Sequence, residues 1–195
     1  MRRGWVASIG HTRAAPDLLD AAFAAGASHM THFMNAMTGM HHRETGAVTW
    51  GLTRDDVTCD VIADAVHVHP LALQIILRCK TPERVVLISD AVSPAGCGDG
   101  DFELWGGSVR VEHGRTQSEA GSLSGSVITV LDAVRLMLSL GVPLTHVARM
   151  ASLNPARLLR LDGECGSITE GKRADLVAVD DDGRVRLTLV GGRVV

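Results

Sequence analysis

The chain has 195 residues, of which 46% are hydrophobic, and a formal net charge of −3 at pH 7. This length and apolar content allow a sizeable core, so we expect a soluble globular protein. The basic residues are scattered and no stretch approaches the roughly 20 apolar residues of a membrane-spanning helix, so neither nucleic acid nor a membrane is expected as a partner.

The first ninety residues are predicted to alternate strands with helices. Three short apolar stretches end at a histidine, namely residues 6–11 at His11, 28–32 at His32 and 61–67 at His67. Pro16 and Gly26 suit the two ends of a helix between the first two stretches, and Pro70 suits the beginning of another. The order strand, helix, strand implies parallel strands with right-handed crossovers.

A fourth apolar run, residues 85–91, is the most informative in the chain. It reaches Asp90 and is then broken by Pro94 and Gly96, which is typical of a buried parallel strand that delivers a carboxylate to a loop. In a barrel of parallel strands, the residue just past the carboxyl end of a strand faces the mouth of the active site. Asp90 is therefore expected where the chemistry takes place.

The second half of the chain changes in character. Residues 102–105 and 108–111 flank two glycines and predict a hairpin. Helices are predicted over 127–140 and from Pro143 onward. Beyond Asp162, three short strands are predicted between Asp- and Gly-containing turns, at residues 174–179, 185–190 and 194–195.

The three histidines and Asp90 follow one another at intervals of about one strand–helix unit. Any one of the histidines alone is more readily explained as a hydrogen-bonded structural residue. Together, however, imidazoles suit zinc and similar ions, and a carboxylate completes either the coordination or the proton chemistry. The pattern predicts a metal-assisted hydrolase.

Five motifs resemble, in order, those of the N-acetylglucosamine-6-phosphate deacetylases, a family within the amidohydrolase superfamily. They occupy residues 10–12, 31–37, 63–68, 89–96 and 123–126. The tail, with Asn154-Pro155-Ala156 and residues 174–177, is similar to the usual C-terminal segment of the superfamily. The resemblance covers nearly the whole chain, and its most specific parts are residues 31–37 and 89–96.

The resemblance implies an α/β fold: a partial (β/α)8 amidohydrolase-type barrel over residues 1–161, made of the C-terminal strands, and a small C-terminal β appendage over 162–195. A complete barrel takes about 250 residues. We therefore expect a C-terminal portion of such an enzyme, without the first barrel strands and a glutamate metal ligand. Alone, it is expected to be a poor deacetylase with an unpaired edge strand near Trp5.

The resemblance also implies roles at the site. His11 and His32 are expected to bind a divalent metal ion, with Zn²⁺ expected first and Fe²⁺, Mn²⁺ or Co²⁺ as alternatives. Asp90 is the expected catalytic acid and base. The expected substrate-binding residues are Asn35, Ala36, Arg43, Asp64, His67, Leu123, Ser124 and Gly125. His41 and His42 are expected to be surface residues.

Some of these assignments have alternatives. An isolated loop arginine such as Arg43 is often merely solvated, and residues 123–125 could cap the helix that begins near Val127. Asp90 could likewise be a helix-capping residue, although Pro94 disfavours this. Ala65 departs from the family, which commonly has glycine there.

The implied reaction is hydrolysis of N-acetylglucosamine 6-phosphate to glucosamine 6-phosphate and acetate, in amino sugar catabolism. One alternative is another cytoplasmic amidohydrolase that acts on a cyclic amide or a nucleobase, which the phosphate-directed Asn35 and Arg43 disfavour. Another is a noncatalytic remnant that binds only a sugar phosphate or a partner chain. A homodimer is expected for the full-length enzyme.

The four cysteines are far apart and form no CxxC pair. They are expected to be free thiols in a reducing cytoplasm.

Overall fold

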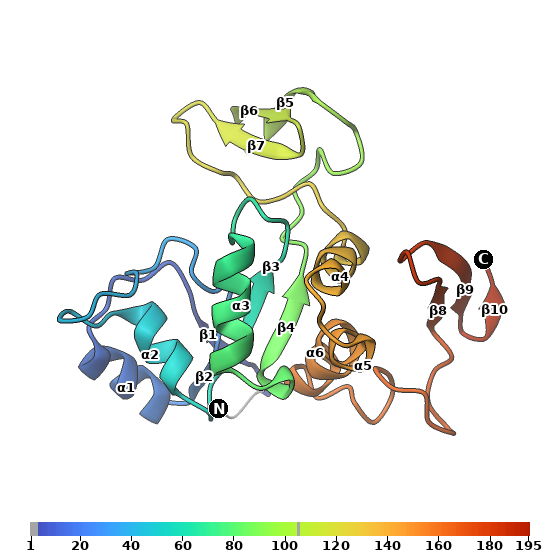
Figure 1. The fold of residues 1–195 in the computed structure, drawn as a ribbon, viewed down its shortest axis with the longest axis horizontal. Helices are drawn as coiled ribbons and strands as arrows, with labels where there is room; N and C mark the ends of the chain where they lie inside the picture. Colours follow the sequence, from blue (N-terminus) through green and yellow to red (C-terminus); the bar gives the residue numbers. More distant parts are fainter. Residues whose placement is uncertain (1–3, 105) are drawn as a thin grey trace.

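The computed structural model describes residues 4–104 and 106–195. A parallel sheet has the strand order β1 (Ala7–Ile9), β2 (Ala27–Met30), β3 (Thr58–Ile62) and β4 (Val85–Ile88) (Figure 1). Helices α1 (Pro16–Ala24), α2 (Ala47–Thr53) and α3 (Pro70–Cys79) lie on the connections between successive strands. The predicted parallel strand–helix alternation is confirmed.

Strands β3 and β4 are largely buried, with apolar side chains on both faces. Cys59 and Val61 of β3 pack into the same core as Val85 and Leu87 of β4, together with residues of the covering helices. Successive strand residues point to opposite faces. The intervening residue Asp60 therefore lies on the face that points away from the helices.

Two elements differ from the sequence prediction. Helix α2 was not foreseen, because five of its seven residues are buried and it shows no polar face. The predicted stretch 61–67 does not form a strand to His67: β3 ends at Ile62. The Asp64 carboxylate accepts hydrogen bonds from the next backbone amides, and Ala65 has φ +62°, so the chain turns before it reaches His67.

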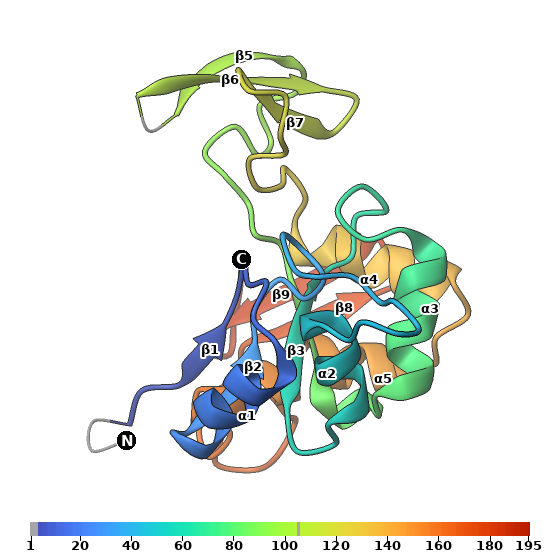
Figure 2. The same cartoon turned by 90° about the vertical axis from the view of Figure 1, so that its left-hand side faces the viewer.

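An antiparallel sheet is inserted between β4 and the next helix. It contains β5 (Gly100–Leu104), β6 (Gly107–Glu112) and β7 (Arg115–Ser118), and in both ribbon views it stands apart beyond one end of the parallel sheet (Figures 1 and 2). The predicted hairpin is confirmed, although Trp105, the end of its first predicted strand, lies outside the described residues. Strand β7 was not predicted.

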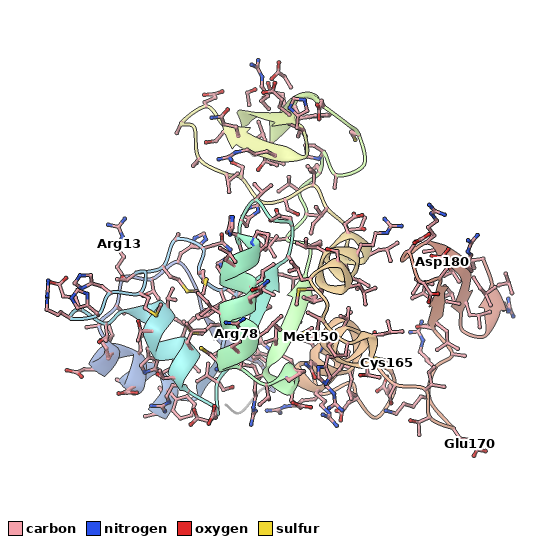
Figure 3. All side chains as sticks on the ribbon, viewed as in Figure 1. Arg13, Arg78, Met150, Cys165, Glu170 and Asp180 are labelled. Atoms are coloured by element: carbon pink, nitrogen blue, oxygen red, sulfur yellow. The ribbon has the colours of Figure 1, made fainter. Side chains whose placement is uncertain are left out.

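Three helices then pack beside β4. They are α4 (Val130–Ser139), α5 (Leu144–Ala148) and α6 (Asn154–Leu158), and a π-helical turn, Arg149–Leu153, joins the last two. Helix α4 begins later than the predicted residue 127, because the Thr129 side chain and Asp132 form a capping box. Met150 of the π-helical turn is fully buried (Figure 3).

The chain ends in a small antiparallel sheet. Its strands are β8 (Leu176–Val179), β9 (Val185–Val190) and β10 (Arg193–Val194), close to the three predicted strands. The parallel sheet does not close into a barrel within residues 4–104 and 106–195, since β1 and β4 are its outer strands. The α/β class, the partial barrel and the β appendage are thus confirmed.

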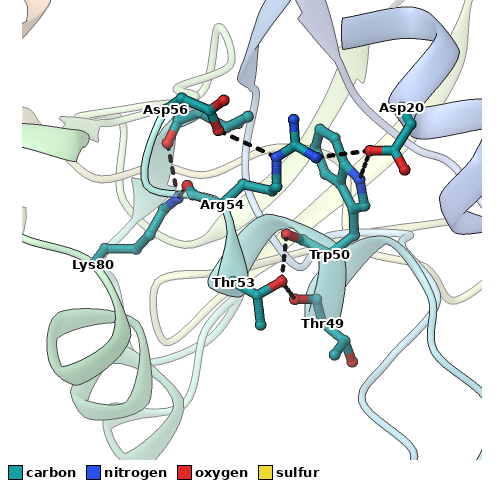
Figure 4. Close-up of polar contacts among 8 residues, drawn as sticks. Asp20, Thr49, Trp50, Thr53, Arg54, Asp56 and Lys80 are labelled. Atoms are coloured by element: carbon teal, nitrogen blue, oxygen red, sulfur yellow. Dashed lines mark hydrogen bonds and ion pairs between the residues drawn. The ribbon is translucent and has the colours of Figure 1, made fainter.

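A polar cluster fixes α2 against α1 (Figure 4). The Arg54 guanidinium donates to Asp20 (Nη1 to Oδ1, 2.8 Å) and to Asp56 (Nε to Oδ1, 3.2 Å), and the Trp50 indole also donates to Asp20 (2.9 Å). The same guanidinium lies 4.6 Å from the Phe23 ring centroid. These contacts hold α2, which ends the segment that runs from His32 after β2.

The four cysteines are free thiols. Burial raises the pKa of Cys59 to about 12, so this thiol is unreactive in the folded chain. None of the described helices has the length and apolar character needed to cross a bilayer.

Candidate active site

The four parallel strands end in the same way. His11, His32, Asp64 and Asp90 each lie two residues beyond the last residue of β1, β2, β3 and β4, respectively. Because the strands are parallel, these residues lie at one edge of the sheet, its carboxyl edge.

The backbone is strained at this edge. The φ angles of His11, His32 and Asp90 are +41°, +31° and +50°, and Ala65, next to Asp64, has φ +62°. Left-handed φ values cost energy for residues other than glycine and cluster at functional sites. Ala65 thus occupies a position where glycine, the common residue of the family that this motif resembles, would be less strained.

His11 and His32 form a pair. Their rings stack with centroids 4.4 Å apart, and His32 Nδ1 is buried with no hydrogen-bond partner among the described residues. Gly10 permits this approach: a Cβ there would lie 2.7 Å from Thr31 Cγ2 and 3.2 Å from His32 Cε1.

Two neighbouring imidazoles with an unpaired ring nitrogen fit a divalent metal ion as two of its ligands. Within the described part of the chain, no third His, Cys, Asp or Glu completes a group of three. A catalytic zinc usually has three protein ligands. The pair therefore accounts for part of a ligand set.

His67 and Asp64 form a second pair. His67 Nδ1 lies 2.7 Å from Asp64 Oδ2, while Asp64 Oδ1 accepts hydrogen bonds from the amides of Val66 (2.8 Å) and His67 (2.7 Å). Both side chains are buried. The Asp64 carboxylate thus holds the His67 ring in place, and its contact with the substrate stays a prediction.

The Asp64 carboxylate makes stability depend on acid pH. Burial by itself would raise its pKa, but hydrogen bonds from the His67 side chain and from the amides of His67 and Val66 outweigh burial and lower the pKa below 3.8. A lowered folded-state pKa contributes stability that is fully present above the unfolded value and is lost as pH falls through the folded value.

We expect the difference in unfolding free energy between the wild type and Asp64→Asn to stay constant above pH 3.8 and to shrink below it. Urea unfolding at a series of pH values measures this difference. A difference that does not change down to strongly acidic pH would show that Asp64 stabilises the loop without its charge.

The loop after β2 carries the predicted phosphate contacts. Asn35 is half-buried and its side-chain amide donates to the His32 carbonyl (2.9 Å), so it is tied to the metal-ligand candidate. Ala36 is exposed with φ +49°. Arg43 is exposed further along the same loop, beside His41 and His42, which are exposed as predicted.

Residues 123–126 are locked to the turn that carries Asp90. The Ser126 amide donates to the Asp90 carbonyl (2.8 Å), and the Val92 amide donates to the Ser126 carbonyl (2.9 Å). The Ser126 hydroxyl also donates to the Ser89 carbonyl. Residues 123–125 do not cap α4, because Thr129 is its cap. Asp90 does not cap a helix either, because the next element along the chain is strand β5.

Thr116 of the inserted sheet is hydrogen-bonded to residues 123–126. This β7 residue is 1% exposed, and its hydroxyl donates to the Gly125 carbonyl (2.6 Å) and accepts from the Ser124 amide (3.0 Å). Thr116 was not predicted, because it lies in a short polar strand without an apolar pattern.

A cavity in the described part of the chain lies away from this site. It has a volume of about 670 Å³ and lies at the amino ends of the parallel strands, where Ser28, Thr58 and Val86 line it. In parallel barrels the amino face serves stability, whereas the chemistry takes place at the carboxyl face. The constellation of side chains, and not the cavity size, therefore locates the candidate site.

Comparison with known proteins identifies the family of the chain. The pattern of the Amidohydrolase family matches residues 3–195. The chain is 43% identical to an N-acetylgalactosamine-6-phosphate deacetylase of Escherichia coli O157:H7 over 95% of the chain and 49% of that protein. It is 39% identical to the N-acetylglucosamine-6-phosphate deacetylase of Bacillus subtilis, over 97% of the chain and 48% of that protein.

A solved structure gives the same result. The crystal structure of N-acetylglucosamine-6-phosphate deacetylase from Thermotoga maritima matches with a TM-score of 0.93 and 35% identity, over 99% of this chain and 53% of that one. The chain thus spans about half the length of these relatives.

Proposed function

The chain belongs to the amidohydrolase family, and on this premise we propose that its carboxyl-edge residues form part of a site that hydrolyses the N-acetyl group of N-acetylglucosamine 6-phosphate. The products are glucosamine 6-phosphate and acetate, as in amino sugar catabolism. The observation that carries the proposal is the location of the His11–His32 pair, the Asp64–His67 pair and Asp90 after the carboxyl ends of neighbouring parallel strands.

Enzymes of this family generally depend on a divalent metal ion. We propose His11 and His32 as two of its ligands, with Zn²⁺ as the first candidate and Fe²⁺, Mn²⁺ or Co²⁺ as alternatives. When bound, such an ion supplies Lewis acidity that acidifies a water molecule and polarises a carbonyl.

The protein side chains supply the proton transfers and the orientation. The Asp90 carboxylate, exposed at the carboxyl edge, takes a proton from the attacking water and returns it to the departing amine. Asp64 orients His67 by accepting a hydrogen bond from Nδ1. In the imidazolium form both ring nitrogens carry a proton, so Nε2 donates a hydrogen bond to the acetyl carbonyl as negative charge develops there.

The substrate's phosphate is assigned to the loop after β2. Arg43 offers a guanidinium, which matches phosphate oxygens in geometry, and Asn35 and the backbone at Ala36 offer further polar contacts. Residues 123–125 face the sugar from the other side of the site, joined to the Asp90 turn through Ser126.

A second substrate has its own support. The E. coli O157:H7 relative at 43% identity acts, by its name, on N-acetylgalactosamine 6-phosphate. The two sugars differ in the configuration of one hydroxyl group, so the same catalytic residues serve both reactions.

The test is acetate release by the Zn²⁺-loaded enzyme from each of the two sugar phosphates and from unphosphorylated N-acetylglucosamine. Release from either phosphorylated sugar, with loss of activity in His11→Ala and His32→Ala, supports the proposal, and the kcat/KM ratio identifies the preferred sugar. Activity on the unphosphorylated sugar that equals activity on both phosphates would overturn the phosphate assignment. Full activity in both histidine variants would overturn the metal assignment.

Three further points are proposed from the resemblance. The barrel portion and the β appendage divide at residues 161 and 162. The protein acts in the cytoplasm, which its free thiols favour. The full-length enzyme is a homodimer.

A further inference from the structure

A buried carboxylate in the neighbouring strand holds the segment that carries His32. Asp60 of β3 is 8% exposed, and its Oδ1 accepts a hydrogen bond from the His32 backbone amide. The Thr31 hydroxyl donates to the same carboxylate, 3.2 Å from Oδ2. Asp60 thus binds both of the first two residues that follow β2.

His29 completes this arrangement from within β2. Its Nε2 lies 2.9 Å from Asp60 Oδ2 and its Nδ1 lies 2.8 Å from the Thr58 hydroxyl, and the residue is only 2% exposed. His29 pairs with Thr58 in the sheet register, so both lie on the face of Asp60, away from the helices. The Asp60 carboxylate is therefore fully engaged by donors inside the partial barrel.

The conformation of His32 explains why such support is needed. Its φ of +31° is unfavourable for a residue with a side chain, and such a conformation persists only where the surroundings impose it. A backbone hydrogen bond from His32 to a fixed acceptor imposes it. The backbone at His32 in turn sets the direction of its imidazole, which stacks on His11.

We propose that Asp60, braced by His29, is a positioning residue that fixes the His32 imidazole against His11 in the orientation for a divalent metal ion. The metal part of this inference rests on the proposed function. The inferred contact acts through the His32 backbone, so Asp60 touches neither the ion nor the substrate. Partners of this kind typically contribute 10- to 100-fold in metal affinity.

The first test needs no metal. In the metal-free chain, NMR is expected to show a nuclear Overhauser effect between the His11 and His32 rings, whose centroids are 4.4 Å apart. Asp60→Asn offers one oxygen where the structure uses two, so this effect is expected to disappear. The matched control is Asn154→Ala, which removes a buried polar group bonded to the Pro82 and Val85 carbonyls near the opposite edge of the sheet and should leave the ring contact intact.

The second test measures Co²⁺ affinity and the visible absorption of bound Co²⁺. Asp60→Asn is expected to weaken binding about 10- to 100-fold and to change the spectrum, whereas Asn154→Ala changes neither. His29→Gln, which can still donate to Asp60, should stay near the wild type, and His29→Leu should behave like Asp60→Asn. If Asp60→Asn does not fold, the comparison of His29→Gln with His29→Leu tests the positioning role.

The outcomes separate the two proposals. An unchanged ring contact and unchanged Co²⁺ affinity in Asp60→Asn would overturn the positioning role. A loss of ring contact and Co²⁺ affinity in Asn154→Ala as large as that in Asp60→Asn would also overturn it, and so would equal losses in His29→Gln and His29→Leu. If the wild type bound no Co²⁺ but Asp60→Asn still lost the ring contact, the positioning role would stand and the proposed metal pair would fall.

Discussion

In the full-length enzyme, replacing Asp90 with asparagine is expected to lower kcat for acetate release by about 100-fold or more while metal binding is retained. Asparagine preserves the shape of the side chain but cannot accept the proton of the attacking water. The Asp90 turn is held by backbone hydrogen bonds to Ser126, which do not involve the Asp90 carboxylate, so the local structure should survive the change.

The matched control is Asp101→Asn. Asp101 is an exposed aspartate of the inserted sheet that forms an ion pair with Arg110 (2.7 Å), and exposed pairs contribute little. Its kcat should remain close to that of the wild type. Metal content, kcat and KM are measured for all three proteins. A near-normal kcat in Asp90→Asn would assign the proton transfer to another group.

Replacing Gly125 with alanine is expected to disrupt the site and the fold together. Gly125 has φ +67°, and a Cβ there would lie 2.9 Å from the Asp90 carbonyl oxygen and 2.6 Å from Val92 Cγ1. Left-handed strain costs about 1–2 kcal/mol and the forced contact about as much again, so unfolding free energy should fall by roughly 2–4 kcal/mol. Displacing the Asp90 turn by about 1 Å should lower kcat/KM on the order of 100-fold.

Gly121→Ala provides the control within the same loop. Gly121 also has a positive φ, of +80°, but a Cβ there would meet only Gln117 Nε2 at 3.8 Å. Alanine should therefore cost about 1 kcal/mol of strain and leave kcat/KM unchanged. Urea unfolding and acetate release measure both variants. Equal losses in the two would show that loop strain, and not contact with the Asp90 turn, is responsible.

The periodic elements of this fold are predictable from local sequence. Pro16 and Pro70 begin helices α1 and α3, and the apolar run before Asp90 forms β4. Proline at a helix start and apolar residues in a buried strand act through their neighbours in the chain, so a short window of sequence suffices. The parallel order then places His11, His32 and Asp90 at one edge of the sheet.

Elements whose stability comes from distant contacts escaped prediction. Helix α2 contains Thr49 and Gly51, which are poor helix formers, and it is stabilised by packing and by the Arg54 cluster. Strand β7 is polar, and pairing with β6 and the contacts of Thr116 hold it in place. Tertiary packing overrides local preference in both cases.

The sequence by itself determined the α/β class and the strand–helix alternation that brings His11, His32 and Asp90 to one edge of the sheet, but it placed the end of β3 too late, at His67. The tertiary structure alone decided how those groups are held: Asp60 lies 28 positions from His32, and Ser126 lies 37 positions from Ser89, yet each pair is hydrogen-bonded. Such contacts leave no periodic signal, because they join residues from different strands and loops. They form only after the sheet has brought those strands together, and their burial then makes the hydrogen bonds strong.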